Sequence, residues 1–257
     1  MPGRQRLRHV EHSMGTVFSF DIRIAARSDA PRVRAGLAAA VAGLHRVDEI
    51  FSTYRQDSQL SRLARGELPL GDCVAEVAEV LDLCSEAEHE SNGWFTARYA
   101  GELDPTGLVK GWAVECAVRM LASSGADSVC LNGGGDIQLY GGPWRVGVCD
   151  PLHPGELVTV IEADEGVAVA TSGPAERGCH IVVPHTRRPP AEGMASMTVV
   201  CPGLTRADAR ATAAYAMGGR ARDWLEELPD TEGFAVNADG STWRTSGFDR
   251  HTAKLTA

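Results

Sequence analysis

The spacing of apolar residues predicts helices in several parts of the chain. Apolar side chains that recur every three or four positions share one face of a helix. The clearest such stretch is residues 31–51, whose apolar face would consist of Val33, Leu37, Val41, Leu44, Val47 and Phe51. Further helices are expected after a cap at Asp57 or Ser58, at 73–90, from Trp112 to Leu121, from Thr205 to Gly218, and near 220–228.

Alternating apolar and polar residues predict strands before the first of these helices and again between residues 127 and 201. Residues 7–26 indicate one long strand or a strand pair, interrupted by Met14-Gly15-Thr16, where the glycine suits a bulge or a close backbone approach. Turn sequences separate later strand segments at 127–131, 136–140, 144–149, 157–162, 167–171, 180–183 and 196–201. Helices first and mostly antiparallel-looking strands later favour an α+β fold. No linker or internal repeat divides residues 1–257, so we expect a single domain.

The stretch from Leu103 to Leu121 is typical of a loop that feeds directly into a helix. Such a loop directs backbone N–H groups at one point, beside a helix N-terminus that favours anions. Lys110 is expected in this loop, and Gly111 would leave room for a close backbone approach. Lysine occurs only at Lys110 and Lys254, whereas arginine fills the other basic positions. The alternative is an ordinary helix cap with a solvated lysine.

Composition narrows the function classes. The 257 residues carry a formal net charge of −9, and no run of like charges is long enough for a nucleic-acid-binding arm. The seven cysteines form no C-x-x-C pair and are odd in number, which argues against a zinc site and a disulfide framework. The first 16 residues lack the apolar run of a signal peptide, and no window is apolar enough for a membrane span. We therefore expect a cytoplasmic protein.

Asp208 and Thr212 are the first candidates for metal binding. They are four residues apart in an expected helix, so their side chains would share one face. A carboxylate and a hydroxyl, with one or two backbone carbonyls, form an oxygen set suited to Mg²⁺. The alternative is structural, because Thr205 and Asp208 have the spacing of a capping box.

Three other features admit a chemical or a structural role. The glycine-rich turn in residues 131–141 either cradles a phosphate or forms a hairpin, and it lacks the helix that a dinucleotide fingerprint requires. Tyr54 follows a helix in a polar loop, where its ring would stack on a planar ligand or fill a core. His180 begins an apolar segment and would act either as a general base or as a structural histidine.

Several of these segments stand in an order that resembles the ApbE family of FAD:protein FMN transferases over nearly the whole chain. The matching segments are HSMGTVFSFDI, VDEIFSTYRQDSQLSRL, LDPTGLVKGWAVE, LNGGGDIQLYG, VAVATSG, HIVVPHT and SMTVVCPGLTRADARATAAYAMG. The resemblance implies an α+β fold on an antiparallel sheet of the T-fold type. It also implies an enzyme that binds FAD with Mg²⁺ and transfers FMN to a Ser or Thr of a target flavoprotein, releasing AMP.

The resemblance also implies roles for individual residues. Contacts with the flavin or the rest of FAD fall on Met14, Tyr54, Trp94, Phe95, Thr96, Asp104, Lys110 and Val182. The metal ligands would be the Gly107 carbonyl, Asp208, the Ala211 carbonyl and Thr212. His180 corresponds to the histidine that activates the acceptor hydroxyl. The chain departs from the family pattern at Val183, where Asp is usual, and at Arg187, where Gly is usual.

Two further functions stay open at this point. An FAD pyrophosphatase would use the same metal site to release FMN and AMP into water. A non-catalytic FAD-binding protein would use the same contacts without reaction. Since no export signal is present in the sequence, the acceptor of a transferase would be a cytoplasmic flavoprotein.

Overall fold

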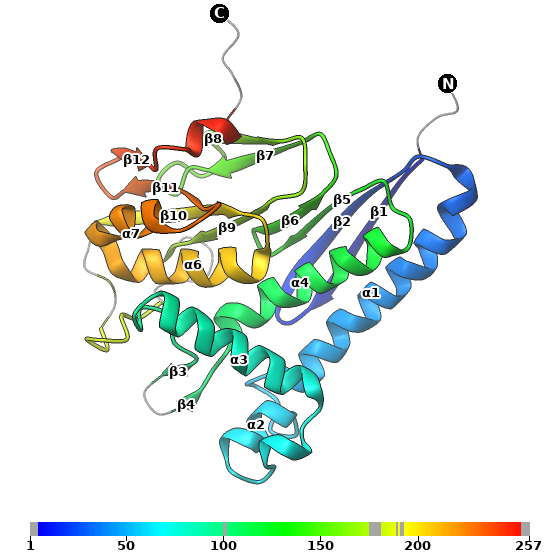
Figure 1. Ribbon diagram of the computed structural model, residues 1–257, viewed down its shortest axis with the longest axis horizontal. Coiled ribbons are helices and arrows are strands. Elements are labelled where there is room, and N and C mark those ends of the chain that lie inside the picture. The colour runs from blue at the N-terminus through cyan, green and yellow to red at the C-terminus, as the bar shows by residue number, and fades with distance from the viewer. Residues whose placement is uncertain (1–4, 100–101, 175–180, 189, 191–192, 253–257) are drawn as a thin grey trace, which may run out of the picture.

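The computed structural model describes residues 5–99, 102–174, 181–188, 190 and 193–252. Its centre is an eight-stranded sheet whose neighbouring strands are all antiparallel (Figure 1). The order across the sheet is β1 (Gln5–Ser13), β2 (Thr16–Ile24), β5 (Ser128–Gly133), β6 (Asp136–Tyr140), β9 (Ala168–Ser172), β10 (Met194–Cys201), β11 (Glu232–Asn237) and β12 (Thr242–Arg244). The α+β class with an antiparallel sheet is therefore confirmed.

Two short hairpins lie outside this sheet. They pair β3 (Arg98–Tyr99) with β4 (Glu102–Leu103), and β7 (Trp144–Cys149) with β8 (Leu157–Ala163). The β7–β8 hairpin packs near the β9–β11 half of the sheet (Figure 1).

The alternating segment at residues 7–26 is a strand pair. Ser13 pairs with Thr16, so Met14 and Gly15 are the two residues of the hairpin turn. Both have positive φ, 48° and 67°, as hairpin turns that match the strand twist require. A Cβ on Gly15 would meet nothing within 4 Å, so the glycine serves the turn and not a close approach.

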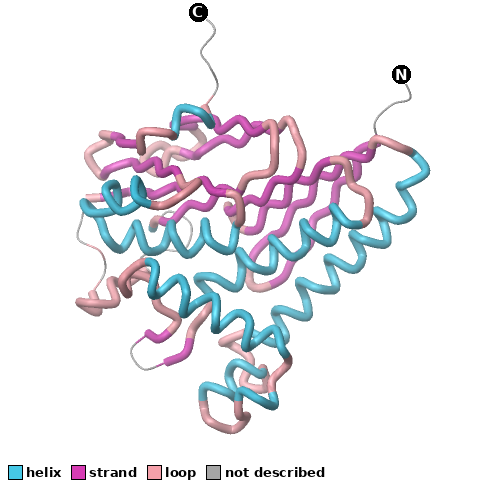
Figure 2. The backbone as a smooth tube through the Cα atoms, in the orientation of Figure 1, coloured by secondary structure: helices cyan, strands magenta, loops and turns pink. Residues whose placement is uncertain are grey.

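Three long helices cover one face of the sheet (Figures 1 and 2). They are α1 (Ala30–Phe51), α4 (Thr106–Ser123) and α6 (Leu204–Met217). Three further helices, α2 (Gln59–Ala64), α3 (Ala75–Glu90) and α7 (Ala221–Glu227), pack around them. Of the two candidate caps for α2, Asp57 and Ser58, the structure has Ser58, whose Oγ accepts a hydrogen bond from the Ser61 N–H at 3.0 Å.

Two apolar cores lie on opposite faces of the sheet. The larger one joins the helices to the inward side of β2, where Phe18, Phe20 and Ile22 are buried. The smaller one lies between the β6–β11 part of the sheet and the β7–β8 hairpin, and includes Trp144 and Phe248. The sheet is therefore buried on both faces at its β9–β10 centre, and the functional cavity described below opens in this part of the molecule.

The structure corrects the boundary of the central helix. The helix α4 begins at Thr106, so Gly107, Lys110 and Gly111 lie in its first two turns and not in a loop. Pro105 precedes the helix and its carbonyl accepts hydrogen bonds from the N–H groups of Leu108 and Val109. A proline is compatible with a helix start because the first N–H groups need no partner within the helix.

The strand expected at 180–183 is wrong for the residues that the structure describes. Ile181 and Val182 belong to no strand, and Val183 makes an isolated bridge with Arg188. Pro184 has no N–H to donate, and the chain turns there. His180 lies outside the described residues. None of the helices in the described part of the chain has the length and apolar character needed to cross a membrane.

Candidate active site

The helices α4 and α6 approach each other closely at Gly111. A Cβ at this position would lie 2.7 Å from the Leu204 carbonyl oxygen and 3.1 Å from the Asp208 Cβ. No larger residue fits without a shift of one helix, so the predicted close approach at Gly111 is confirmed. The contact places the first two turns of α4, which carry Lys110, beside the α6 turn that carries Asp208.

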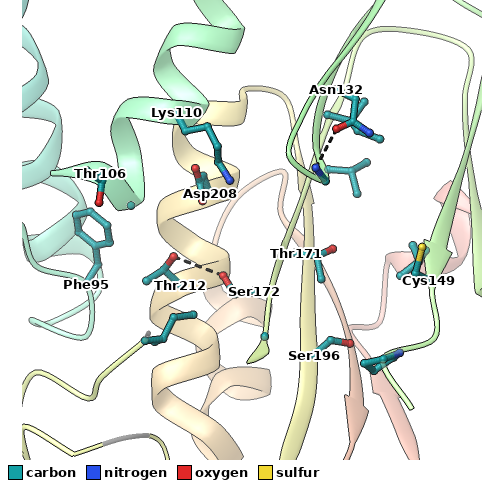
Figure 3. Close-up of a pocket in the computed structure, with 18 of the residues that line it drawn as sticks. Phe95, Thr106, Lys110, Asn132, Cys149, Thr171, Ser172, Ser196, Asp208 and Thr212 are labelled. Carbon is teal, nitrogen blue, oxygen red and sulfur yellow. Dashed lines mark hydrogen bonds between the residues drawn. The ribbon is translucent and has the colours of Figure 1, made fainter. Parts of the chain in front are cut away.

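A cavity of about 500 Å³ opens beside this contact, a size in the usual range for small-molecule sites. Its walls come from the start of α4, the middle of α6, the β5–β6 turn, β9, the end of β7 and the turn around Pro184 (Figure 3). Residues from the sequence prediction that line it are Trp94, Phe95, Thr96, Asp104, Gly107, Lys110, Val182, Asp208 and Thr212.

The N-terminus of α4 faces into this cavity. Thr106 and Gly107 line the wall, and the Thr106 N–H donates to Asp104 Oδ1 at 3.0 Å. The aligned peptide dipoles give this end of the helix a partial positive charge. The N-terminus that the sequence assigned to a loop is therefore the first turn of a helix, and it lines the cavity.

Lys110 forms an ion pair with Asp136, the first residue of β6. Both side chains are largely buried, with 12% and 3% of their surfaces exposed. The second carboxylate oxygen of Asp136 accepts a hydrogen bond from the Thr171 N–H at 3.0 Å. This fixed carboxylate holds the Lys110 ammonium group at the cavity wall.

Asp136 and Thr171 were missed in the sequence analysis. The glycine-rich turn drew attention to residues 131–141, but the choice there was between a phosphate cradle and a hairpin. The structure has a hairpin, with Gly134 and Gly135 at φ 59° and 92° between β5 and β6. The available signal was an acidic residue directly after the turn, at the start of an apolar strand.

Asp208 and Thr212 lie on one face of α6, as predicted, and both line the cavity. Figure 3 shows Asp208 near Lys110 at the end of the cavity where α4 passes α6. Thr212 Oγ1 lies 3.5 Å from Ser172 Oγ of β9. This carboxylate and hydroxyl, one helical turn apart, have the donor chemistry that Mg²⁺ prefers. Ala211 is buried on the same helix but is not among the cavity-lining residues.

The capping-box alternative for Asp208 is wrong. The helix α6 is preceded by Gly203, and no side chain of its own caps it. Glu115 of α4 takes this role instead, because its Oε2 accepts hydrogen bonds from the N–H and the hydroxyl of Thr205 at 3.0 and 2.7 Å. Asp208 is therefore not required as a cap.

Trp94, Phe95 and Thr96 form a turn after α3 at another wall of the cavity. The Phe95 N–H donates to Ser91 Oγ at 2.9 Å, and the Phe95 ring lies 3.5 Å from the position of a Cβ on Gly107. The Trp94 ring meets the His185 ring edge-on at 4.6 Å between centroids. An aromatic wall of this kind suits a planar ligand.

An ion pair between the buried Arg210 and the exposed Glu90 secures this turn to α6. Arg210 donates to both carboxylate oxygens of Glu90 at 2.9 and 2.7 Å, and to Thr231 Oγ1 at 2.6 Å. The hydrogen bonds from Arg210 lower the pKa of the Glu90 carboxyl below its usual value. Because Glu90 is the last residue of α3, the pair fixes the start of the Trp94–Thr96 turn.

Two predicted FAD contacts are not among the residues that line the cavity. Tyr54 is 97% exposed, and Met14 packs at the edge of the larger core. His180 lies outside the described residues, so the structure gives no geometry for it.

The family departures at Val183 and Arg187 fall in one turn. The N–H groups of Thr186 and Arg187 donate to the Val183 carbonyl at 3.2 and 2.8 Å. Arg187 has φ 57°, the left-handed region that favours glycine. The arginine therefore keeps a glycine-like turn, at the conformational expense that a Cβ brings there.

A second group of possible metal ligands lies at the rim. Ligand atoms of Asp150, His153 and Glu156 lie within 4.8 Å of one another. The hydrogen bond between Asp150 and His153 lowers the pKa of the carboxyl and raises the pKa of the imidazole. His153 and Glu156 are exposed, so this group is typical of a solvated surface turn.

The family model and the curated relatives that match this chain belong to the same family. The model of the ApbE family matches residues 14–101 and 98–235. A curated FAD:protein FMN transferase of Rhodobacter capsulatus is 34% identical over 137 residues, which are 49% of this chain and 25% of that protein. One of Vibrio cholerae is 31% identical over 129 residues, or 45% of this chain and 39% of that protein. The alignments thus span less than half of these relatives.

Solved structures match over almost the whole chain. A flavin transferase ApbE from Vibrio cholerae has a TM-score of 0.79 at 20% identity, covering 97% of this chain and 100% of the other. An ApbE protein from Thermotoga maritima has a TM-score of 0.82 at 21% identity, also covering 97% of this chain and 100% of the other. These structures share the fold of this chain.

Proposed function

The chain belongs to the ApbE family, and from that premise and the cavity we propose that it is an FAD:protein FMN transferase. In the proposed reaction, the hydroxyl oxygen of a Ser or Thr on a flavoprotein attacks the phosphorus of the FMN half of FAD. The new bond is a phosphoester, the diphosphate bond breaks, and AMP leaves. The hydroxyl proton passes to a base of the enzyme.

The main support for the proposal is that polar groups of α4 and of α6 line the same cavity. The N-terminus of α4 and Lys110 offer positive charge on one side, and Asp208 with Thr212 offers oxygen ligands on the other. A diphosphate that is attacked by an oxygen needs its negative charge neutralised. An acidic protein with a net charge of −9 must supply that positive charge locally.

The donor set fits Mg²⁺. Asp208 and Thr212 would hold the ion through side-chain oxygens, and Gly107 and Ala211 through backbone carbonyls. When bound, Mg²⁺ would neutralise charge on the diphosphate and on the departing AMP. Lys110, held by Asp136, would bind a phosphate oxygen, and Asp104 would keep the start of α4 in place by accepting from Thr106.

The flavin would lie against the aromatic turn. Trp94, Phe95 and Thr96 would contact the ring system, and Val182 would supply an apolar contact from the facing turn. Met14 and Tyr54 remain proposed flavin contacts, although neither lines the cavity. Measuring FAD affinity after substitution of each residue would test this. We also propose that residues 1–257 act as one transferase domain on a cytoplasmic acceptor.

His180 is the proposed base. General-base assistance contributes about 10²–10⁴-fold to a rate. His180→Asn should therefore bind FAD as the parent does, yet transfer FMN at least about 100-fold more slowly at saturating FAD. If the single-turnover rate of His180→Asn is within about threefold of the parent rate, the loss is far smaller than general-base assistance would cause, and another group accepts the proton.

The direct test is incubation with FAD, Mg²⁺ and a flavoprotein from the same cell, followed by intact mass spectrometry of the flavoprotein. A mass increment of one FMN, with AMP in solution, supports the transferase. Free FMN and AMP without an increment would instead support an FAD pyrophosphatase, which the same metal ligands could serve. Binding of FAD without any product would leave a non-catalytic FAD-binding protein.

A further inference from the structure

A second groove lies directly beside the cavity. Its volume is about 830 Å³, and it is formed by the turn around Pro184, the start of β10, the C-terminal end of α6 and β12. Trp94 lines both the groove and the cavity. The same turn contributes Val182 to the cavity and Arg188 to the groove. The two hollows are therefore neighbours that share a wall.

The groove has an apolar base and two cationic side chains. Met194, Met217 and Trp243 supply apolar surface, while Arg188 and Arg220 are exposed. None of the described residues that line the groove is acidic. In a chain with a net charge of −9, this is a local positive surface that would attract an acidic partner.

Arg220 is held in position at the wall that the two hollows share. Its guanidinium carbon lies 4.4 Å from the centroid of the Trp94 ring, a cation–π contact. The Arg220 charge therefore lies at the boundary of the groove and the flavin side of the cavity. A ligand that pairs with Arg220 would be located next to the reacting centre.

A protein acceptor must occupy surface beside the cavity. Its Ser or Thr hydroxyl has to enter, while the residues on either side of that hydroxyl remain outside. An extended segment advances about 3.3 Å per residue, so only a few flanking residues reach the neighbouring surface. The groove offers those residues apolar contacts from Met217 and Trp243 and a charge partner from each arginine.

We infer that this groove binds the segment of the acceptor flavoprotein that flanks the modified Ser or Thr, and that this segment carries acidic and apolar side chains. The acidic groups pair with Arg188 and Arg220, and the apolar ones pack on the methionine and tryptophan side chains. This inference rests on the proposed function, because it assumes that the acceptor hydroxyl enters the cavity.

The test uses two fluorescent peptides and four proteins. One peptide has a central Thr with two Asp and two Leu on either side, and the other has Lys in place of each Asp. The proteins are the parent, Arg188→Glu, the double variant Arg188→Glu with Arg220→Glu, and Arg34→Glu. Arg34 is an exposed residue of α1, away from the groove, and serves as the matched control.

Fluorescence anisotropy should show the acidic peptide binding the parent at least about tenfold more tightly than the lysine peptide, since like charges oppose docking. The double variant should lose at least about tenfold in affinity for the acidic peptide, and the single variant less. The control should stay within about twofold, and added salt should weaken the parent complex. FAD affinity and the thermal midpoint of Arg188→Glu, which leaves the contact of Arg220 with Trp94 in place, should match those of the parent.

Several results would overturn the inference. They are no binding of the acidic peptide to the parent, equal binding of the two peptides, or binding that survives the double charge reversal. A loss of FAD affinity in Arg188→Glu would mean that the groove holds part of FAD. A parent dimer in sedimentation that the double variant abolishes would mean that the groove holds a second copy of this chain.

The outcome is separable from that of the proposed function. If the parent binds the acidic peptide but transfers no FMN to any flavoprotein, the transferase proposal fails while the groove remains a peptide site. If the parent transfers FMN to a flavoprotein and the double variant does so with the same KM for that acceptor, the groove assignment fails alone.

Discussion

The helices α1 and α6 cover the same face of the sheet, yet they are buried in different ways. In α1, the buried residues form one stripe and the charged ones face solvent. In α6, nearly every residue is buried, including Thr205, Asp208 and Arg210. The first helix follows the rule that apolar residues go inside, and the second breaks it.

The buried polar residues of α6 either bond to a polar partner or line the cavity. Thr205 bonds to Glu115, and Arg210 pairs with Glu90. Asp208 and Thr212 face the cavity. Alanines fill most of the remaining positions and let the neighbouring elements come close. A polar helix buried on nearly all sides therefore marks the functional part of this molecule, whereas an amphipathic helix marks its scaffold.

The largest expected effect is on activity. Asp208→Asn should lower the single-turnover rate of FMN transfer about 10²–10³-fold, because it removes a charge that supports the reacting diphosphate. Glu49→Gln on the exposed side of α1 removes the same charge and should leave the rate unchanged. Quenched-flow kinetics with mass detection would measure both. Equal rates for Asp208→Asn and the parent would contradict the functional assignment of α6.

The next effect is on stability. Arg210→Met should lower the free energy of unfolding by about 1.5–3 kcal/mol, the range for hydrogen bonds to charged groups, because the exposed Glu90 left behind can be solvated by water. Arg34→Met on α1 should change it by less than about 0.5 kcal/mol. Urea unfolding would measure both. A loss below 1 kcal/mol for Arg210→Met would mean that the pair adds little to the packing of α6.

The same pair predicts a pH dependence. Arg210 lowers the folded-state pKa of Glu90 below its usual value of 4.5. The stability that this shift supplies is fully present above pH 4.5 and is lost as the pH falls through the folded-state pKa. The stability gap between the parent and Arg210→Met should therefore be constant near neutrality and narrow below pH 4.5. A gap that widens in acid would contradict this.

Two glycine substitutions compare the packing of the helices. Gly111→Ala should destabilise the protein by about 1–3 kcal/mol, because its Cβ would overlap the α6 backbone. Gly43→Ala on α1 meets nothing within 4 Å and should stabilise by up to about 1 kcal/mol. Thermal unfolding would give both changes. The same sign for the two substitutions would contradict the close α4–α6 contact.

The smallest effect concerns Tyr54, which follows the C-terminus of α1. If its ring stacks on the flavin, as the family resemblance implies, Tyr54→Ala should weaken FAD binding by about 1 kcal/mol. Trp94→Ala, in the cavity wall, should weaken it at least as much. A fluorescence titration with FAD would compare them. Unchanged affinity for Tyr54→Ala would restrict the flavin site to the cavity lining.

The scaffold could be predicted from sequence because its signal is local. The stripe of α1 and the alternation of β2 each depend on one buried face, so periodicity predicts them directly. The start of α4 was placed too late, since Pro105 and Gly107 look like loop residues although they are compatible with a helical first turn. The 180–183 segment was expected to be a strand because an apolar run does not reveal the turn at Pro184.

The site was predicted in part. Asp208 and Thr212 are four residues apart, so helical geometry alone placed them on one face. The pair of Lys110 with Asp136 joins residues 26 positions apart through a folded sheet, which no local pattern shows. For the same reason, the sequence offered a capping box within α6 as an alternative for Asp208 and did not show the contact of Thr205 with Glu115, 90 positions away.

The central claim is that the buried polar face of α6 binds the metal ion of a flavin transferase. The most direct measurement is a titration of Mn²⁺, a probe for the Mg²⁺ site, by electron paramagnetic resonance in the presence of FAD. We predict one saturable site in the parent and in Glu49→Gln, and loss of that site in a folded Asp208→Asn variant. Undiminished Mn²⁺ binding by Asp208→Asn would contradict the claim.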